Sequence, residues 1–128
     1  MYLVSAAVAF VALIGLTVAF QLALSFGKPW GHLTMGGRYP GVLPPAMRAA
    51  AILQSLVLGV LGALVLSRAG VFALPWAPLS RNGIWGAVAV SGISLVMNLA
   101  SPSPPERRLW APVALCLLLS SLAVAFLT

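Results

Sequence analysis

Four long apolar runs, separated by segments rich in glycine and proline, constrain what this chain can fold into. The runs cover Leu3–Phe26, Met47–Ser67, Ile84–Ala100 and Leu109–Leu127. Each is close to the roughly 17–25 residues that an α-helix needs to cross the hydrocarbon core of a bilayer. We therefore predict an all-α integral membrane bundle of four transmembrane helices, forming a single domain over residues 1–128.

The composition excludes a soluble alternative. Hydrophobic residues make up 62% of the chain and charged residues 6%, against about 45–50% and 25% in soluble domains. A short chain buries a smaller fraction of its surface than a large protein does, so it cannot hide this much apolar surface in its own core and lipid must solvate the remainder. The first run lacks a basic leader, and its ~24 residues exceed the apolar part of a usual secretory signal. We expect it to remain as a span of a multi-pass protein of the cell membrane.

The basic residues predict the orientation of the bundle. Seven Lys and Arg residues stand against one acidic residue, but they are scattered at the ends of apolar runs, so no nucleic-acid partner is expected. The first and third loops carry five of them, Lys28, Arg38, Arg48, Arg107 and Arg108, whereas the middle loop carries Arg68 and Arg81. Because cytoplasmic loops are enriched in Lys and Arg, we expect these two loops inside the cell and both termini on the non-cytoplasmic side.

Three segments rich in helix breakers are predicted to be loops: Gly27–Pro45, Gly70–Gly83 and Ser101–Pro112. The first is long compared with helix–helix connections of about 2–8 residues. Two interpretations fit it. It is either an ordered cap at the membrane interface, held by Trp30, Tyr39 and its prolines, or a re-entrant or ligand-binding loop.

Small residues recur at four-residue spacing in two of the runs. The second run has Ala51, Ser55, Gly59 and Ala63, and the third has Gly83, Ala87 and Ser91. Such stripes let helix backbones approach closely in membranes. They fit packing within the bundle or packing between copies in a homo-oligomer.

Polar side chains inside the runs gather toward one membrane face. Gln21, Gln54, Asn98 and Cys116 all lie within roughly 3–11 Å of the ends that adjoin the first and third loops, at about 1.5 Å per helical residue, and Ser94 lies one turn before Asn98. One hypothesis is a polar vestibule that binds a ligand, completed by Trp30, His32, Arg38 and Arg107. The alternative is that these groups form hydrogen bonds between helices.

His32 and Glu106 are the candidate acid/base residues, as the only histidine and the only acidic side chain. Glu106 also fits a structural role, because Ser103 three residues earlier completes a helix-capping pattern. A third interpretation joins it to nearby arginines that hold an anionic head group. With no Asp, a single Glu and only Cys116, the sequence excludes paired-carboxylate catalysis, an intrachain disulfide and multi-cysteine metal sites. We expect no metal and no cofactor.

Several short motifs resemble those of small four-span bacterial membrane proteins that have no assigned activity. They are Pro29-Trp30-Gly31, Gly36-Gly37-Arg38, Leu43-Pro44-Pro45 with Arg48, and Ser101-Pro102-Ser103 with Glu106-Arg107. This resemblance covers most of the chain and implies the four-span topology alone.

Three functions are consistent with these features. The first is transport or binding of a lipophilic or weakly polar small molecule at the vestibule, with membrane lipids as neighbours. The second is an enzyme that acts on a lipid or isoprenoid-like substrate with His32 or Glu106 as its acid/base. The third is an accessory subunit of a membrane complex.

Overall fold

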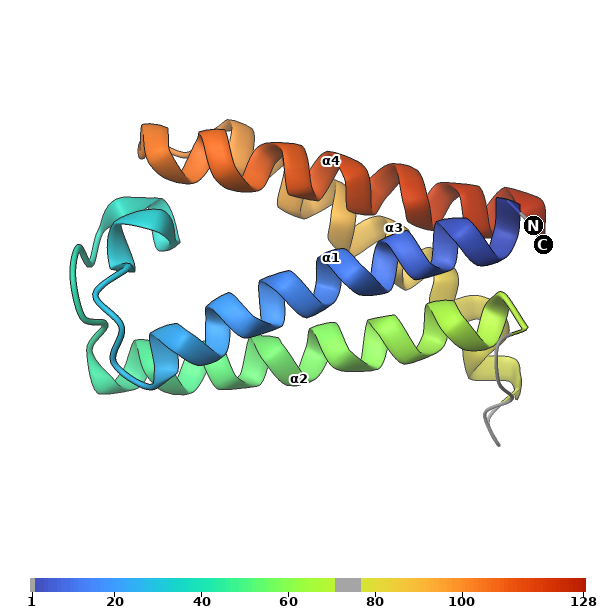
Figure 1. Cartoon of the computed structure of the whole chain (residues 1–128), viewed down its shortest axis with the longest axis horizontal. Coiled ribbons are helices and arrows are strands. Elements are labelled where there is room, and N and C mark those ends of the chain that lie inside the picture. Colours follow the sequence, from blue (N-terminus) through green and yellow to red (C-terminus); the bar gives the residue numbers. More distant parts are fainter. Residues whose placement is uncertain (1, 71–76) are drawn as a thin grey trace.

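The computed structural model describes residues 2–70 and 77–128, and every regular element in these residues is helical. Its elements are α1 (Tyr2–Ser25), the short 3-10 turns η1 (Gly31–Leu33) and η2 (Met35–Gly37), α2 (Pro45–Arg68), α3 (Ala77–Leu99) and α4 (Pro104–Leu127) (Figure 1). Each long helix contains a segment of the length and hydropathy needed to cross a membrane; in α3 it is Asn82–Leu99. The predicted all-α bundle is confirmed, and the chain has the fold of a multi-pass membrane protein.

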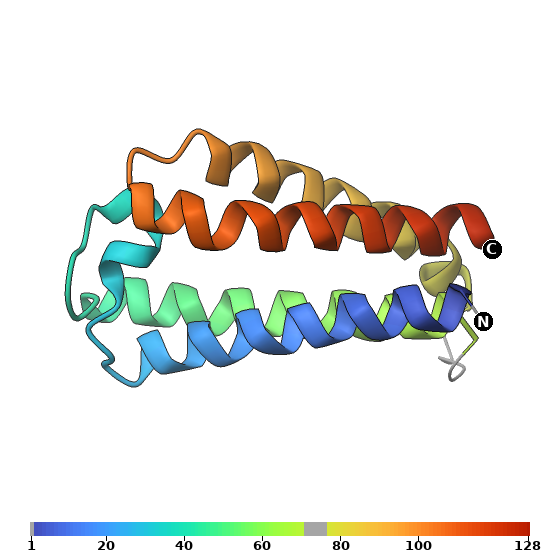
Figure 2. The same ribbon diagram turned by 45° about the horizontal axis from the view of Figure 1, so that its top comes forward.

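The four helices run alternately up and down. Both termini lie at one end of the bundle, which we call the terminal end, and the first loop and the α3–α4 connection lie at the other, the loop end (Figures 1 and 2). The helix α4 packs against α1 and α3, and α2 also packs against both of these helices. This arrangement agrees with the predicted placement of the first and third loops together.

Two helix boundaries differ from the sequence-based prediction. The helix α4 begins at Pro104, and Pro112 lies inside it, so the predicted loop Ser101–Pro112 is wrong beyond Ser103. Proline is well tolerated in the first helical turn, where backbone N–H groups have no partner in the helix. The helix α3 likewise begins at Ala77, inside the predicted loop 70–83. Residues 71–76 of that loop, and the side chain of Arg81, lie outside the described part of the chain.

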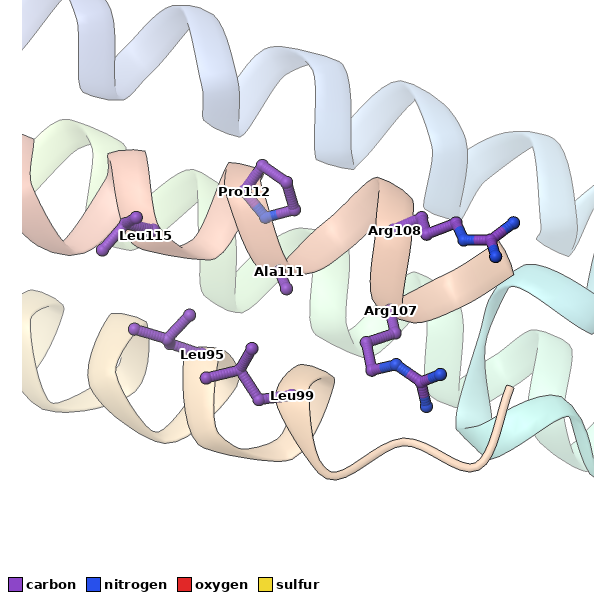
Figure 3. Close-up of a pocket in the computed structure, with 7 residues that line it drawn as sticks. All are labelled: Leu95, Leu99, Arg107, Arg108, Ala111, Pro112 and Leu115. Atoms are coloured by element: carbon purple, nitrogen blue, oxygen red, sulfur yellow. The ribbon is translucent and has the colours of Figure 1, made fainter. Parts of the chain in front are cut away.

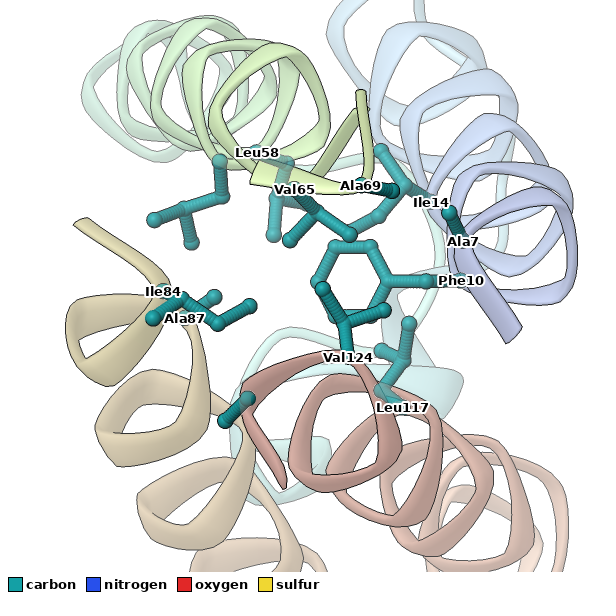
Figure 4. Close-up of a cluster of buried hydrophobic side chains, with 12 residues drawn as sticks. Ala7, Phe10, Ile14, Leu58, Val65, Ala69, Ile84, Ala87, Leu117 and Val124 are labelled. Carbon is teal, nitrogen blue, oxygen red and sulfur yellow. The ribbon is translucent and has the colours of Figure 1, made fainter. Parts of the chain in front are cut away.

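An apolar cluster fills the interior of the terminal half. Phe10 is fully buried at its centre, and Figure 4 shows its ring between Val65 of α2 and both Leu117 and Val124 of α4. Lipid tails are as apolar as these side chains, so close van der Waals packing, rather than escape from water, holds such a cluster together.

The small residues of α3 face the inside of the bundle. Ala87 and Ser91 are buried, and a Cβ placed on Gly83 would lie 2.8 Å from Leu64 Cδ1 of α2. In α2, Ala51 and Ser55 are buried as well, whereas Gly59 is exposed with no neighbouring atom within 4 Å of a Cβ placed on it. The predicted stripe of α3 and half of the stripe of α2 therefore serve helix packing within the single chain.

Candidate functional site

A polar cluster joins the first loop to the beginning of α4. The carboxylate oxygen Oε2 of Glu106 accepts hydrogen bonds from the backbone N–H of Gly36, at 2.9 Å, and from the hydroxyl of Ser101, at 2.8 Å. Glu106 is only 8% exposed. A buried carboxylate is costly unless hydrogen bonds satisfy it, and these two bonds come from segments that are 70 and 5 residues away in the chain. The bond from Gly36 holds the first loop against α4, and the bond from Ser101 holds the α3–α4 connection.

Ser103 is the N-cap of α4 and makes a second link to the loop. Its hydroxyl donates to the backbone carbonyl of His32 at 2.7 Å and accepts from the backbone N–H of Glu106 at 3.5 Å. The predicted cap is therefore present at Ser103. In a full capping box, the Glu106 carboxylate would also accept from the Ser103 backbone N–H. Here that N–H donates to the Ser101 hydroxyl at 3.2 Å, and the carboxylate accepts from the Gly36 N–H of the first loop instead.

The first loop can present an N–H to Glu106 because of its unusual backbone. Three successive residues, Met35, Gly36 and Gly37, have positive φ angles of 52°, 68° and 74°, a conformation that glycine adopts without steric cost. Gly31 allows a close approach as well, since a Cβ placed on it would lie 1.7 Å from the carbonyl oxygen of Tyr39. The Gly31 N–H donates to the Gly41 carbonyl at 2.8 Å and closes the loop. This geometry is that of an ordered cap across the end of the bundle.

Arg107 extends the same network. Its Nη1 donates to the backbone carbonyl of Ser101 at 2.6 Å, and the side chain is half-buried. A guanidinium group carries five N–H donors, so most of them remain available after this bond. The first loop, Glu106, Ser101 and Arg107 are thus connected by consecutive hydrogen bonds.

A groove of about 450 Å³ runs between α3 and α4 from this cluster. Figure 3 shows Leu95 and Leu99 of α3 facing Ala111 and Leu115 of α4 across it, while Arg107 extends toward the α3–α4 connection. Arg108 and Pro112 complete its lining, and the Arg108 side chain extends from the side of α4 that faces away from α3. The groove is therefore apolar along its length and has a cation at the loop end.

The residues of the predicted vestibule do not surround one space. Gln21 is buried inside the bundle, whereas Gln54 is exposed on its outer surface. Asn98 Nδ2 donates to the Ser94 carbonyl at 2.8 Å, so these two residues bond within α3 rather than to another helix.

The remaining predicted site residues lie on the outside of the first loop. The side chains of His32 and Arg38 are exposed. The Trp30 ring stacks on Phe20 of α1, with centroids 6.1 Å apart, and Lys28 Nζ lies 5.9 Å from the Trp30 centroid. Trp30 therefore anchors the loop to α1, and only Arg107 of the predicted binding residues lines the groove.

Sequence reasoning missed most residues of the groove. Leu95, Leu99 and Leu115 look like ordinary residues of a membrane span, and their facing positions follow from how α3 packs on α4. Pro112 carried a signal, because a proline inside an apolar run leaves the carbonyl four residues earlier without its helical donor. Among the described residues, no group of three or more His, Cys, Asp or Glu side chains is placed to hold a metal ion.

The fold and this site define the class of protein: a multi-pass helical membrane protein with a capped loop end and an apolar groove between α3 and α4. No protein-family model, curated protein or solved structure matches the chain.

Proposed function

We propose that this protein binds an anionic membrane lipid in the groove between α3 and α4, with Arg107 holding the head group. The observation that carries the proposal is the combination of apolar walls with one guanidinium group at the loop end. A lipid that lies along the groove places its acyl chain against Leu95, Leu99 and Leu115 and its phosphate beside Arg107.

The size and chemistry of the groove support such a ligand. Its volume of about 450 Å³ falls within the roughly 300–1,000 Å³ of small-molecule sites. Arginine binds phosphate through two parallel N–H donors and is always charged. The bond from Arg107 Nη1 to the Ser101 carbonyl restricts the guanidinium group before the lipid arrives, which lowers the entropic cost of binding.

Pro112 leaves one backbone carbonyl of α4 without its helical donor. Because proline has no N–H, the carbonyl of Arg108, four residues earlier, has no helical donor. Both residues line the groove. In the proposed complex, a glycerol hydroxyl of the head group donates to this carbonyl.

Binding fits the structure better than passage through the bundle or acid/base chemistry. Among the described residues, the interior of the terminal half is filled by the apolar cluster around Phe10, and its buried Ser121 hydroxyl donates within α4 to the Leu118 carbonyl. Neither His32 nor Glu106 lines the groove, and the Glu106 carboxylate accepts its two bonds from Gly36 and Ser101.

The proposed orientation places the groove in the cytoplasmic leaflet of the cell membrane. The basic residues of the first and third loops support it, because Lys and Arg favour the cytoplasmic side and anionic lipids attract them there. In a Cys116→Ser background, the loop variant His32→Cys should resist a membrane-impermeant maleimide in intact cells, while Thr128→Cys at the C-terminus should react. The reverse labelling would contradict this orientation.

Native mass spectrometry from lipid nanodiscs tests the binding. We expect the wild type to retain phosphatidylglycerol in preference to phosphatidylcholine of the same acyl chains, with the preference lost in Arg107→Gln. Arg38→Gln is the matched control, because it removes an exposed arginine of the same end that does not line the groove. Equal retention of both lipids by the wild type would refute the proposal, and the same spectra report the number of chains per complex.

A further inference from the structure

Gln21 is a second candidate binding residue, separate from the groove. It lies on α1 and is only 6% exposed, yet its amide oxygen Oε1 has no hydrogen-bond donor among the described residues. An unsatisfied buried acceptor destabilises a folded protein, because it has lost its hydrogen bonds to solvent without gaining others. Polar groups inside membrane spans are expensive and tend to mark functional sites.

The register of α1 and α2 places Ser55 at the level of Gln21. A Cβ on Gly62 of α2 would lie 3.7 Å from Ile14 Cγ2 of α1, and these antiparallel helices pack side by side (Figures 1 and 2). Gln21 and Ser55 lie seven residues from that contact on their own helices, which is about two turns. Seven residues also return to nearly the same face, and Ser55 is 8% exposed. Both side chains therefore face the same interior region.

The neighbouring hydroxyl groups do not satisfy the Gln21 oxygen. The Ser55 hydroxyl donates to the Ala51 carbonyl at 3.0 Å, and the Thr17 hydroxyl, one turn before Gln21, donates to the Leu13 carbonyl at 2.9 Å. Each hydroxyl has a single hydrogen to donate. Both oxygens keep acceptor capacity, so this region of the α1–α2 interface has acceptors in excess of donors.

We propose that Gln21 Oε1 accepts a hydrogen bond from the hydroxyl group of a small guest at the α1–α2 interface. The oxygen of the guest accepts in turn from the Gln21 amide N–H. Water and a lipophilic alcohol share this pair of bonds to Gln21, and a water molecule donates its second hydrogen to Ser55 Oγ. The site is independent of Arg107 and the α3–α4 groove, so it stands whether or not that groove binds lipid.

Proton NMR of protein carrying ¹⁵N-labelled glutamine tests the proposal in perdeuterated dodecylphosphocholine micelles, whose detergent has no hydroxyl group. Comparison with Gln54→Asn, at the exposed position of α2, assigns the remaining glutamine signals. We expect a cross-peak from the Gln21 side-chain amide protons to water or, after addition of 1-decanol, to the decanol protons beside its hydroxyl. The first result identifies water as the guest, and the second identifies a lipophilic alcohol. The absence of both cross-peaks would overturn the proposal.

A stability measurement gives a second outcome that does not depend on NMR assignment. If a guest satisfies the amide, Gln21→Leu removes its bonds and lowers the melting temperature, and if that guest is water, Ser55→Ala lowers it as well. If the oxygen stays unpaired, the apolar leucine suits the buried position better. A higher melting temperature for Gln21→Leu would therefore also overturn the proposal.

Discussion

The link between Glu106 and Gly36 predicts how firmly the first loop is held. Replacing Glu106 by alanine removes the acceptor for the Gly36 N–H and for the Ser101 hydroxyl, which lie 2.9 and 2.8 Å from Oε2. A hydrogen bond to a charged group contributes about 1.5–3 kcal/mol, and each 1.4 kcal/mol is a tenfold change in an equilibrium. Local opening of the loop at Gly36 should therefore become about 10- to 150-fold more frequent in Glu106→Ala.

Hydrogen–deuterium exchange with mass spectrometry measures this opening directly. In nanodiscs, peptides that contain Gly36 should exchange faster in Glu106→Ala by that factor, while α1 peptides around Phe10 should exchange as in the wild type. Glu106→Gln is the matched control, because its amide oxygen still accepts one bond, and we expect an increase below about tenfold from the loss of charge. Unchanged exchange at Gly36 in Glu106→Ala would refute the reasoning that this carboxylate holds the loop.

Three further predictions concern the loop, the cap and the core. Gly31→Ala should lower the melting temperature, because the added Cβ would lie 1.7 Å from the Tyr39 carbonyl oxygen. A Cβ added at Gly59 meets no atom within 4 Å, so Gly59→Ala should leave the melting temperature unchanged or raise it. Equal melting curves for the two variants would contradict the close approach at Gly31. Ser103→Ala loses the N-cap of α4 and the bond to the His32 carbonyl. The free energy of unfolding in a detergent titration should therefore fall by about 1–2 kcal/mol. An unchanged free energy would show that the cap contributes nothing. Phe10→Ala opens a cavity at a fully buried position and should lower the free energy of unfolding by about 3 kcal/mol in the same titration. Leu16 is 53% exposed on the same helix, so Leu16→Ala should lower it far less. A similar decrease in both variants would contradict the packing of the core.

The sequence predicted the fold class because span length and hydropathy are local properties. The predicted runs overlap all four observed helices. Their up-and-down order follows because each run crosses the membrane once, so successive helices alternate in direction. The errors lie at proline. The sequence predicts Pro104 and Pro112 in a loop, yet α4 includes both. A proline in the first turn loses no helical bond, and Pro112 lies at an exposed position of a membrane helix, where proline is tolerated.

The candidate site was predicted only in part. Glu106 was identified by its rarity and Ser103 by its spacing from it, but the partner of the carboxylate, the Gly36 N–H, is 70 residues away. Gln21 and Gln54 have the same chemistry and similar depth, so the sequence treated them alike. Helix rotation separates them: Gln21 faces the interior and Gln54 the outer surface.

The sequence by itself determined that this protein is a bundle of four membrane-spanning helices, and it predicted basic loops at one end, because these properties depend on the length, hydropathy and charge of single segments. Only the tertiary structure decided which polar groups meet. The pairing of the first loop with α4, the groove between α3 and α4, and the burial of Gln21 all depend on helix rotation and register. Those are set by side-chain packing between segments far apart in the chain, which no local pattern encodes.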